Sequence, residues 1–327
     1  MGVKRKVRVA TGNEGILLYD AFAEFIADKV VLNKSPKTID NYEKSFNYFV
    51  EYEFDEPNEV DISTVLKPYV MQWVEGMLKD KKRITTINHY LRDVRSFLYW
   101  CMDSDRQYIP QYKIELVSGQ EELPKIFTDE EVELLLQKPL NQRDFVEWRT
   151  WAIVNWVMAT GNRAATICNV KLEDINFSKK QIILRHTKNK KAQAIPLSSA
   201  LERALKQYIN KCRSGANVTN ESWLFPSCED EQLTYSALAQ SFRNYCKERG
   251  TTHTNIHGLR HYFATYWAKN NKDSGDRLQK ILGHSTYAMT QKYIELTDED
   301  LKENYDNLVP LDNRNKAKRH RKKVQIN

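Results

Sequence analysis

The chain has 327 residues, enough for two domains with sizeable cores, and its hydrophobic content of 41% is ordinary for a globular protein. No apolar run approaches the length of a membrane span, and no apolar segment follows the basic N-terminus as it would in a signal peptide. The formal net charge of +7 favours a polyanionic partner, so composition argues against a membrane protein and for one that binds nucleic acid.

Cysteine usage bears on compartment and on metal sites. The five cysteines are scattered, odd in number and never spaced as Cys-x-x-Cys. This pattern predicts reduced thiols in a cytoplasmic protein and argues against a structural zinc site.

Basic residues crowd both ends of the chain, in residues 1–13 and 309–327. Runs of this kind are ordinarily solvated, so we expect a flexible N-terminus and a flexible C-terminal tail. Contact with phosphates is the functional alternative.

Apolar residues recur with a helical period in the N-terminal third, which predicts a helical domain over residues 14–103. A serine or threonine stands before two of the helices as an N-cap, and one is followed by proline at the first helical position. The helices are expected over residues 17–31, from Ser35-Pro36 to about Val50, over residues 66–78, and from Thr85-Thr86 to about Cys101.

Two of these helices carry basic or amide side chains opposite their apolar stripes. Polar helix faces are ordinarily just solvated, and contact with a DNA duplex is the functional alternative. The residues predicted to contact DNA are Lys44, Arg83, Thr85, Thr86, Asn88, Arg92 and Arg95. Ser45 is expected on the same exposed face as Lys44.

Residues 104–123 have weak periodicity and many turn residues, so we expect an interdomain linker there and a second domain over residues 124–308. Thr128 and Glu131 fit a capping box, and the apolar helix that starts at Phe145 stops at Thr160-Gly161. Further elements are expected as strands over residues 181–186 and 192–197 with a turn at Asn189-Lys190, and as helices over residues 198–212, 233–249 and 297–308.

The stretch from His257 to Tyr293 carries the chemistry. His257, Arg260 and His261 are spaced i, i+3 and i+4, so on a helix they share one face. Their donors suit a phosphodiester. The opposite stripe, expected to be buried, consists of Leu259, Phe263, Tyr266 and Trp267. Gly283 permits a sharp turn that aims His284 back at the same place.

Each piece alone has an ordinary structural explanation, but the order and spacing together resemble the signature of the tyrosine recombinases, the phage integrase family. The resemblance extends to an arginine after Thr160-Gly161 and to a hairpin lysine eight residues before Pro196. The catalytic residues that it implies are Arg163, Lys188, His257, Arg260, His284 and Tyr293.

The resemblance implies a mainly helical α+β chain, in which a SAM-like four-helix core-binding domain precedes a catalytic domain with a small β-hairpin. It implies that Tyr293 attacks a DNA phosphodiester to give a 3′-phosphotyrosine, without metal, ATP or other cofactor. Arg163 and Arg260 would hold the non-bridging oxygens, and Lys188 would protonate the leaving oxygen. The implied active unit is a homo-tetramer on two double-stranded DNA sites, with strands exchanged through a Holliday junction.

Some assignments stay open at this point. Lys190 and Lys191 compete with Lys188, and Tyr287 is a rival nucleophile at a spacing that the family does not use. His257 and His284 cannot be given separate roles. His261 is expected to act as a buffer to Tyr293 or as a structural partner, not as a primary catalyst. Many family members carry an acid three residues after the first arginine, where this chain has Thr166; the candidates to compensate are Glu173 and Asp174.

The main expectation is a site-specific recombinase that integrates and excises a phage or transposon, with an accessory DNA-bending protein as a possible further partner. The alternatives are a recombinase that resolves chromosome or plasmid dimers, a type IB topoisomerase, and a DNA-binding regulator without catalysis. A compact helical N-terminal domain speaks against the topoisomerase, and a complete set of motif residues speaks against the regulator.

Overall fold

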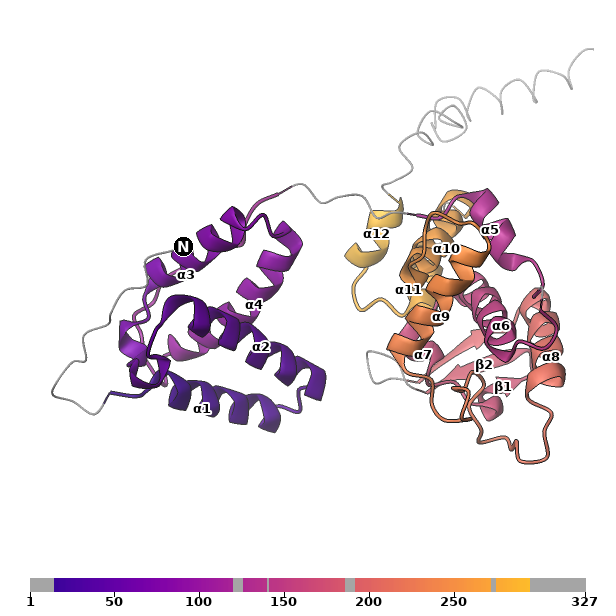
Figure 1. The fold of residues 1–327 in the computed structure, drawn as a ribbon, viewed down its shortest axis with the longest axis horizontal. Coiled ribbons are helices and arrows are strands. Elements are labelled where there is room, and N and C mark those ends of the chain that lie inside the picture. The colour runs from indigo at the N-terminus through magenta and orange to yellow at the C-terminus, as the bar shows by residue number, and fades with distance from the viewer. Residues whose placement is uncertain (1–14, 120–125, 140, 186–191, 272–274, 295–327) are drawn as a thin grey trace, which may run out of the picture. The chain divides into compact units, whose positions relative to one another are not determined.

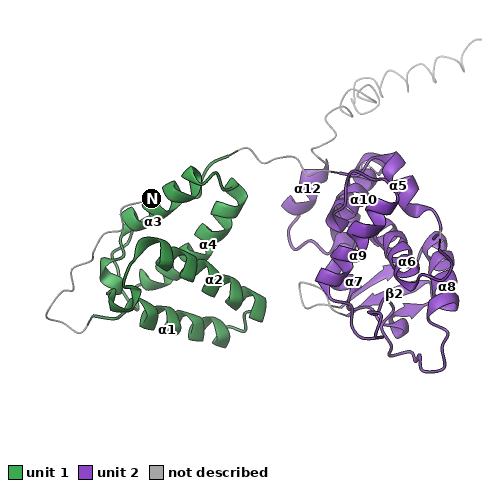
Figure 2. Cartoon of the chain, in the orientation of Figure 1, with its two compact units in different colours: residues 1–122 green, residues 123–327 purple. Residues whose placement is uncertain are grey.

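The computed structural model describes residues 15–119, 126–139, 141–185, 192–271 and 275–294. The chain divides into two compact units, residues 1–122 and 123–327 (Figure 2). Each unit has its own buried core. The predicted tails, the turn at Asn189-Lys190 and the helix over residues 297–308 lie outside the described residues. No helix in the described ranges is long and apolar enough to cross a membrane.

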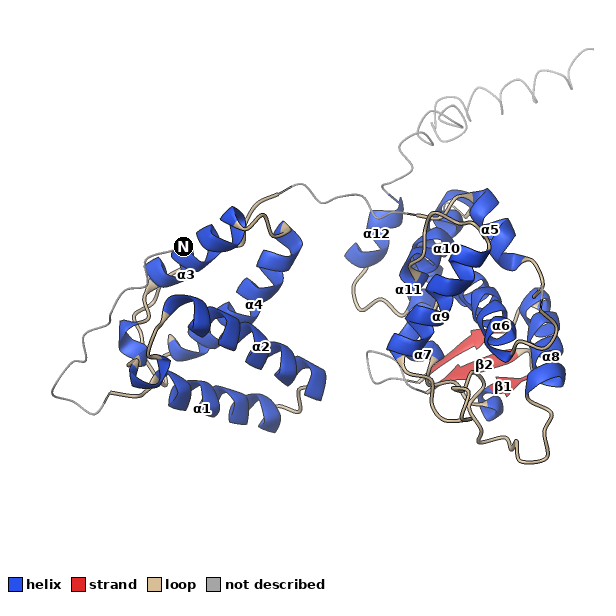
Figure 3. Ribbon diagram, in the orientation of Figure 1, coloured by secondary structure: helices blue, strands red, loops and turns tan. Residues whose placement is uncertain are grey.

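The first unit is built from helices joined by two short 3-10 turns (Figures 1 and 3). Its α-helices are α1 (Leu18–Val31), α2 (Pro36–Glu53), α3 (Lys67–Lys79) and α4 (Ile84–Cys101). Ser35 caps α2 by accepting a hydrogen bond from the Thr38 N–H, as predicted. The predicted cap at Thr85-Thr86 is wrong, because α4 already begins at Ile84 and has no side-chain cap.

Aromatic rings form the centre of this unit. The rings of Phe22 in α1 and Phe46 in α2 are stacked at 3.7 Å, and Phe97 in α4 packs edge-on against both. Phe25 joins the same cluster. The edge-on pairs add to the stabilisation from burial, so the cluster holds three helices in a fixed arrangement.

The segment after α4 packs against the first unit. Ile109 and Ile114 are buried, and the backbone of Val117 exchanges two hydrogen bonds of 2.9 Å with the Asn88 carboxamide. The described part of the expected linker, residues 104–119, is therefore a fixed part of this unit. The periodicity of its sequence is weak because the segment is extended and is held by side-chain contacts. An extended segment has no helical face, so its apolar residues do not recur with a helical period.

The second unit consists of helices packed around one buried helix, α6 (Phe145–Thr160), and of a small antiparallel sheet (Figure 3). Its helices are α5 (Asp129–Leu136), α6 (Phe145–Thr160), α7 (Ala164–Ile167), α8 (Ser199–Cys212), α9 (Tyr235–Glu248), α10 (Ile256–Asn270), α11 (Gly275–Leu282) and α12 (Ala288–Ile294). The strands, in sheet order, are β1 (Ile175–Asn176), β2 (Gln181–Leu184) and β3 (Gln193–Pro196). The β2–β3 pair confirms the predicted hairpin strands, and β1 was not predicted.

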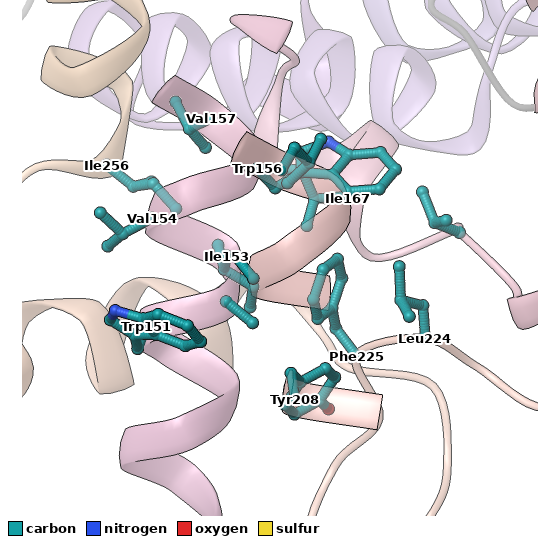
Figure 4. Close-up of a cluster of buried hydrophobic side chains, with 14 of the residues drawn as sticks. Trp151, Ile153, Val154, Trp156, Val157, Ile167, Tyr208, Leu224, Phe225 and Ile256 are labelled. Carbon is teal, nitrogen blue, oxygen red and sulfur yellow. The ribbon is translucent and has the colours of Figure 1, made fainter. Parts of the chain in front are cut away.

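Helix α6 is the centre of the second core. Trp151, Ile153, Val154 and Trp156 point to different sides of the helix and are all buried (Figure 4). Helices α5, α8, α9 and α10 pack around it. A helix that is apolar all round must be buried all round, which is why its sequence lacks a polar stripe.

The turn that ends α6 requires glycine. Gly161 has a φ of +61°, and a Cβ there would lie 2.5 Å from the Phe263 ring and 2.7 Å from the Leu282 side chain. Glycine is the residue that accepts this left-handed conformation without strain. The turn therefore brings α6 close to α10 and α11, and it places Arg163 two residues beyond.

Candidate active site

Five of the six predicted catalytic residues meet where the end of α6, the start of α10, the turn after α11 and α12 come together. They are Arg163, His257, Arg260, His284 and Tyr293. Lys188 and its rivals Lys190 and Lys191 lie in residues 186–191, outside the described residues.

Arg260 is buried with 2% of its surface exposed and is held by several acceptors. Its Nη1 donates to the Gly161 carbonyl at 2.7 Å, and its Nη2 donates to the Leu282 carbonyl at 3.0 Å. The same Nη2 contacts Nε2 of His284 at 2.8 Å. The two carbonyls stand at the C-terminal ends of α6 and α11, where the partial charge of a helix is negative, so the fold itself fixes this guanidinium.

Arg163 donates hydrogen bonds to the same turn at the end of α11. Its Nη1 donates to the carbonyls of Leu282 and Gly283, both at 3.3 Å. In the described part of the chain, neither Arg163 nor Arg260 has a carboxylate partner within salt-bridge distance. Burial and the neighbouring charge of Arg163 lower the pKa of Arg260 to about 10. Two guanidinium groups held together without an acid form a site that favours an anion.

Tyr293 is buried beside these arginines, with 8% of its surface exposed. Its hydroxyl lies 2.8 Å from Nδ1 of His261, and its ring is nearly parallel to that of His284, with centroids 6.3 Å apart. Burial raises the pKa of the Tyr293 phenol, while the charges of Arg260 and Arg163 oppose that rise. The rival Tyr287 is 44% exposed.

The pKa values of the three histidines at the site, His257, His261 and His284, are all lowered. Burial, together with the positive charges nearby, lowers the pKa values of His257 and His284 to about 4. Burial and the charge of Arg260 also lower the pKa of His261. The His257 side chain is still open to solvent, and its ring meets that of His261 edge-on at 4.6 Å. At neutral pH we therefore expect uncharged imidazoles that can accept protons.

His261 and Thr290 were missing from the predicted catalytic set, yet both touch it. His261 contacts the Tyr293 hydroxyl, and Thr290 Oγ1 lies 2.9 Å from Nδ1 of His284. The spacing of His261 from His257 did place both on one helix face, which was the available signal. Nothing in the sequence pointed to Thr290. Tyr266, expected in the buried stripe, is instead 57% exposed.

Glu173 and Asp174 do not replace an acid at Thr166. Both oxygens of Asp174 are engaged, one by the Lys171 N–H and the other by Arg185, and Glu173 also pairs with Arg185. Thr166 instead lines a cavity of about 360 Å³ beside Arg163. The arginines are thus oriented by helix-end carbonyls.

The residues predicted to contact DNA differ in their exposure to solvent. Arg83, Thr85, Thr86 and Arg92 are exposed, and Lys44 is exposed in a pair with Asp40. The prediction for Asn88 is wrong, because its carboxamide is buried and bonded to Val117. Arg95 is half-buried and donates to the Ile114 carbonyl at 3.4 Å.

Ser45, expected on the exposed face, is also buried and donates to Asp93. Both errors arise where another segment covers the polar face of a helix. Elsewhere, no group of three or more His, Cys, Asp or Glu residues in the described ranges is arranged to hold a metal ion.

Comparison with known proteins places this geometry in a family. The model of the phage integrase family matches residues 125–300, more than half of the chain. The tyrosine recombinase XerD of Listeria innocua is 28% identical over 306 residues, covering 90% of this chain and 98% of the relative. The tyrosine recombinase XerA of Pyrococcus horikoshii is 26% identical over 294 residues, covering 89% and 94%.

Solved structures agree on the fold. The Tn1549 transposon integrase in complex with a circular intermediate DNA has a TM-score of 0.72 and 20% identity, covering 88% of this chain and 98% of that one. A lambda integrase tetramer bound to a Holliday junction has a TM-score of 0.67 and 15% identity, covering 86% and 78%. The expectation of a mainly helical chain with a small sheet is confirmed.

Proposed function

The chain belongs to the phage integrase family, and from that membership we propose that it is a site-specific DNA recombinase. Tyr293 attacks a phosphodiester, its oxygen forms the new bond to phosphorus, and the 5′-oxygen leaves as a hydroxyl. The 3′-phosphotyrosine conserves the bond energy, so the reverse attack rejoins a strand without ATP. The observation that carries this proposal is the buried Tyr293 phenol beside two arginines that have no acid partner among the described residues.

The two arginines are proposed to bind the non-bridging phosphate oxygens. Negative charge gathers on those oxygens when phosphorus becomes five-coordinate, and donors already aimed at such charge give the largest single contribution to many rate enhancements. The carbonyls of Gly161 and Leu282 support this role by fixing Arg260 before DNA arrives. Loss of one such donor costs ~3–4 kcal/mol in comparable sites.

The phenol proton must leave as Tyr293 attacks. His261 is the acceptor favoured by the 2.8 Å contact, because its lowered pKa keeps the ring uncharged at neutral pH, and the tautomer with its hydrogen on Nε2 leaves Nδ1 free to take the phenol proton. His257, one helical turn earlier, is proposed to bind a phosphate oxygen from the open side of the site. Lys188 remains the proposed donor of a proton to the leaving 5′-oxygen, on the resemblance alone.

The biological role divides into two candidates. Integration and excision of a mobile element is our main proposal, supported at the level of the fold by the likeness to a transposon integrase. Dimer resolution is the second candidate, favoured by Xer relatives that are matched over nearly their whole length. We propose a homo-tetramer on two DNA sites in either case, with the exposed Lys44, Arg83, Thr85, Thr86 and Arg92 facing the duplex.

The experiment that tests the reaction is the capture of a covalent adduct. Nicked duplexes taken from DNA that flanks the protein's own gene serve as suicide substrates, because the short fragment diffuses away after cleavage. We expect an adduct that survives SDS with the wild type and none with Tyr293→Phe, while both bind the DNA equally. Tyr287→Phe is the matched control and retains the adduct.

The outcomes separate the candidates. Tight binding without an adduct would support a regulator, and relaxation of supercoiled DNA without strand exchange would support a topoisomerase. If an adduct forms, plasmids carrying two copies of the site report deletion, inversion or fusion. Recombination only between the site and a foreign target supports mobile-element integration, and recombination between identical sites supports dimer resolution.

A further inference from the structure

A continuous line of hydrogen bonds joins Arg260 to the helix that carries the nucleophile. Arg260 Nη2 lies 2.8 Å from His284 Nε2, and His284 Nδ1 lies 2.9 Å from Thr290 Oγ1. All three side chains are buried, with 2%, 9% and 0% of their surfaces exposed. Thr290 and Tyr293 are both in α12, three residues apart.

The donors and acceptors along this line can be assigned by elimination. A guanidinium has no acceptor, so Arg260 must donate and His284 Nε2 must accept. A neutral imidazole carries one N–H, and that proton must therefore be on Nδ1. It follows that Thr290 Oγ1 is the acceptor, since a hydroxyl donating to Nδ1 would leave the ring without any proton. The lowered pKa of His284 agrees with an uncharged ring.

We propose that Thr290 is a positioning residue that fixes the tautomer of His284 and, through it, the direction of Arg260. This proposal rests on the proposed recombinase function for its catalytic consequence. Without the Thr290 oxygen, the Nδ1–H of His284 is a buried donor lacking its acceptor, which favours the other tautomer. The other tautomer places a hydrogen on Nε2, where it faces the Arg260 donor, so the guanidinium has to move.

The arrangement also links this tautomer to the seating of α12. Because Thr290 and Tyr293 lie on neighbouring positions of one short helix, the hydrogen bond to His284 forms only while the nucleophile's helix is in place. The carbonyls of Gly161 and Leu282 hold Arg260 in either case, and docking of Tyr293 adds the third contact, from His284, that completes its orientation. Arg260 is held by His284 when the nucleophile is present and loses that acceptor when the helix departs.

The test compares Thr290→Val, which keeps the shape and removes the oxygen, with Thr290→Ser, which keeps the oxygen. The DNA-free full-length protein is labelled with ¹⁵N-histidine, and His284 is assigned by the signal that disappears in His284→Gln. The ¹⁵N shifts report which ring nitrogen carries the proton. We expect protonated Nδ1 in the wild type and in Thr290→Ser, and protonated Nε2 in Thr290→Val.

Cleavage of the suicide substrate is measured on the same variants. We expect Thr290→Val to slow single-turnover cleavage about tenfold, the equivalent of one lost hydrogen bond, and Thr290→Ser to remain near the wild-type rate. Thr286→Val, at an exposed position in the bend before α12, is the control and has no effect. Thr290→Ala repeats the comparison in case valine disturbs the packing of α12.

The proposal is overturned if His284 keeps its proton on Nδ1 in both apolar variants, whatever their cleavage rates. It is equally overturned if the tautomer changes while cleavage does not, because Arg260 is then indifferent to His284. The histidine spectra are recorded without DNA, so they stand apart from the proposed reaction. Absence of any wild-type adduct would reject the recombinase function and leave the tautomer result intact.

Discussion

The hydroxyl of Tyr293 lies 2.8 Å from Nδ1 of His261, a residue 32 positions earlier in the chain and one helical turn beyond His257. The side chain in contact with the proposed nucleophile is therefore the second histidine of the His-x-x-Arg-His motif. His257 stands beside it, with its ring edge-on to that of His261.

Replacing His261 by Gln removes the acceptor while keeping a polar side chain of similar reach. We expect single-turnover cleavage to fall about 100-fold, the low end for loss of a general base, with DNA affinity unchanged. His257→Gln is the matched variant and should cost less. A larger loss in His257→Gln than in His261→Gln would assign the proton to His257 instead.

Arg260→Lys keeps the positive charge but cannot reach the Gly161 carbonyl, the Leu282 carbonyl and His284 together. We expect cleavage to fall by about 10²–10³, as for loss of an oxyanion donor, with little change in DNA affinity. The measurement is adduct formation at saturating enzyme. Near wild-type cleavage by the lysine variant would show that charge alone suffices and that the fork geometry is not used.

The imidazole of His284 should titrate near pH 4, because burial and the charges of Arg260 and Arg163 disfavour its protonated form. A histidine whose folded pKa is lowered stabilises the fold above its unfolded value of ~6.5 and loses that contribution as pH falls towards 4. The expected loss is roughly 3 kcal/mol. Histidine NMR signals followed from pH 8 to pH 3.5 give the midpoint, and a midpoint above pH 6 contradicts it.

Glu131 should stabilise the second unit in a pH-dependent way. Burial raises its pKa, but hydrogen bonds from Thr252, His253 and the Thr128 N–H outweigh burial and bring the value to about 2. A lowered carboxyl pKa gives stability that is complete above ~4.3 and is lost as pH falls towards 2. Glu131→Gln should therefore cost roughly 3 kcal/mol at pH 7 and progressively less below pH 4.

That prediction is checked by urea unfolding of the full chain, followed through the amide signals of α5. Glu130→Gln is the control, since Glu130 is the exposed neighbour in the same first turn. Equal losses for both variants, or a loss that stays constant down to pH 3, would show that the capping contacts do not depend on the charge of Glu131.

Arg92 and Asn88 form a matched pair on α4, since one is exposed and the other is buried. Arg92→Ala should weaken DNA binding and lower the slope of log affinity against log salt by about 0.9, the value for one lost phosphate contact. Asn88→Ala should leave that slope unchanged and destabilise the first unit by about 1–3 kcal/mol, because it removes both hydrogen bonds to the backbone of the half-buried Val117. Filter binding across salt and urea unfolding distinguish the two effects.

Sequence reasoning succeeded where one element carries the whole signal. The uniform apolar character of α6, the glycine after Thr160 and the capping box at Thr128 each follow from local rules, and the structure has all three. The order of Arg163, Arg260, His284 and Tyr293 then led to a site that the structure does assemble. Motif spacing reflects side chains that share one ligand, so the motif can be recognised in the sequence without knowledge of the packing.

Sequence reasoning failed where a segment distant in the chain determines the burial or the partner of a residue. Asn88 looked like a solvated amide, and only the later segment around Val117 reveals that it is buried. Thr290 looked like any polar residue of a short helix, and only the imidazole across the turn gives it a partner. Helical periodicity predicts which residues share one face of a helix, but it does not show which other segment packs on that face. The errors at Asn88 and Thr290 both have this cause.

The burial of Tyr293 also bears on the safety of the break that it makes. In the proposed reaction, a phosphotyrosine formed at Tyr293, which packs in one cluster with residues of α10 and α11, would be shielded from bulk water, the competitor that would turn a reversible cut into permanent damage. The strand's own 5′-hydroxyl, held nearby by duplex pairing, is then the favoured attacking group. In the proposed reaction, the small solvent exposure of Tyr293 would therefore limit how often a cut strand fails to close.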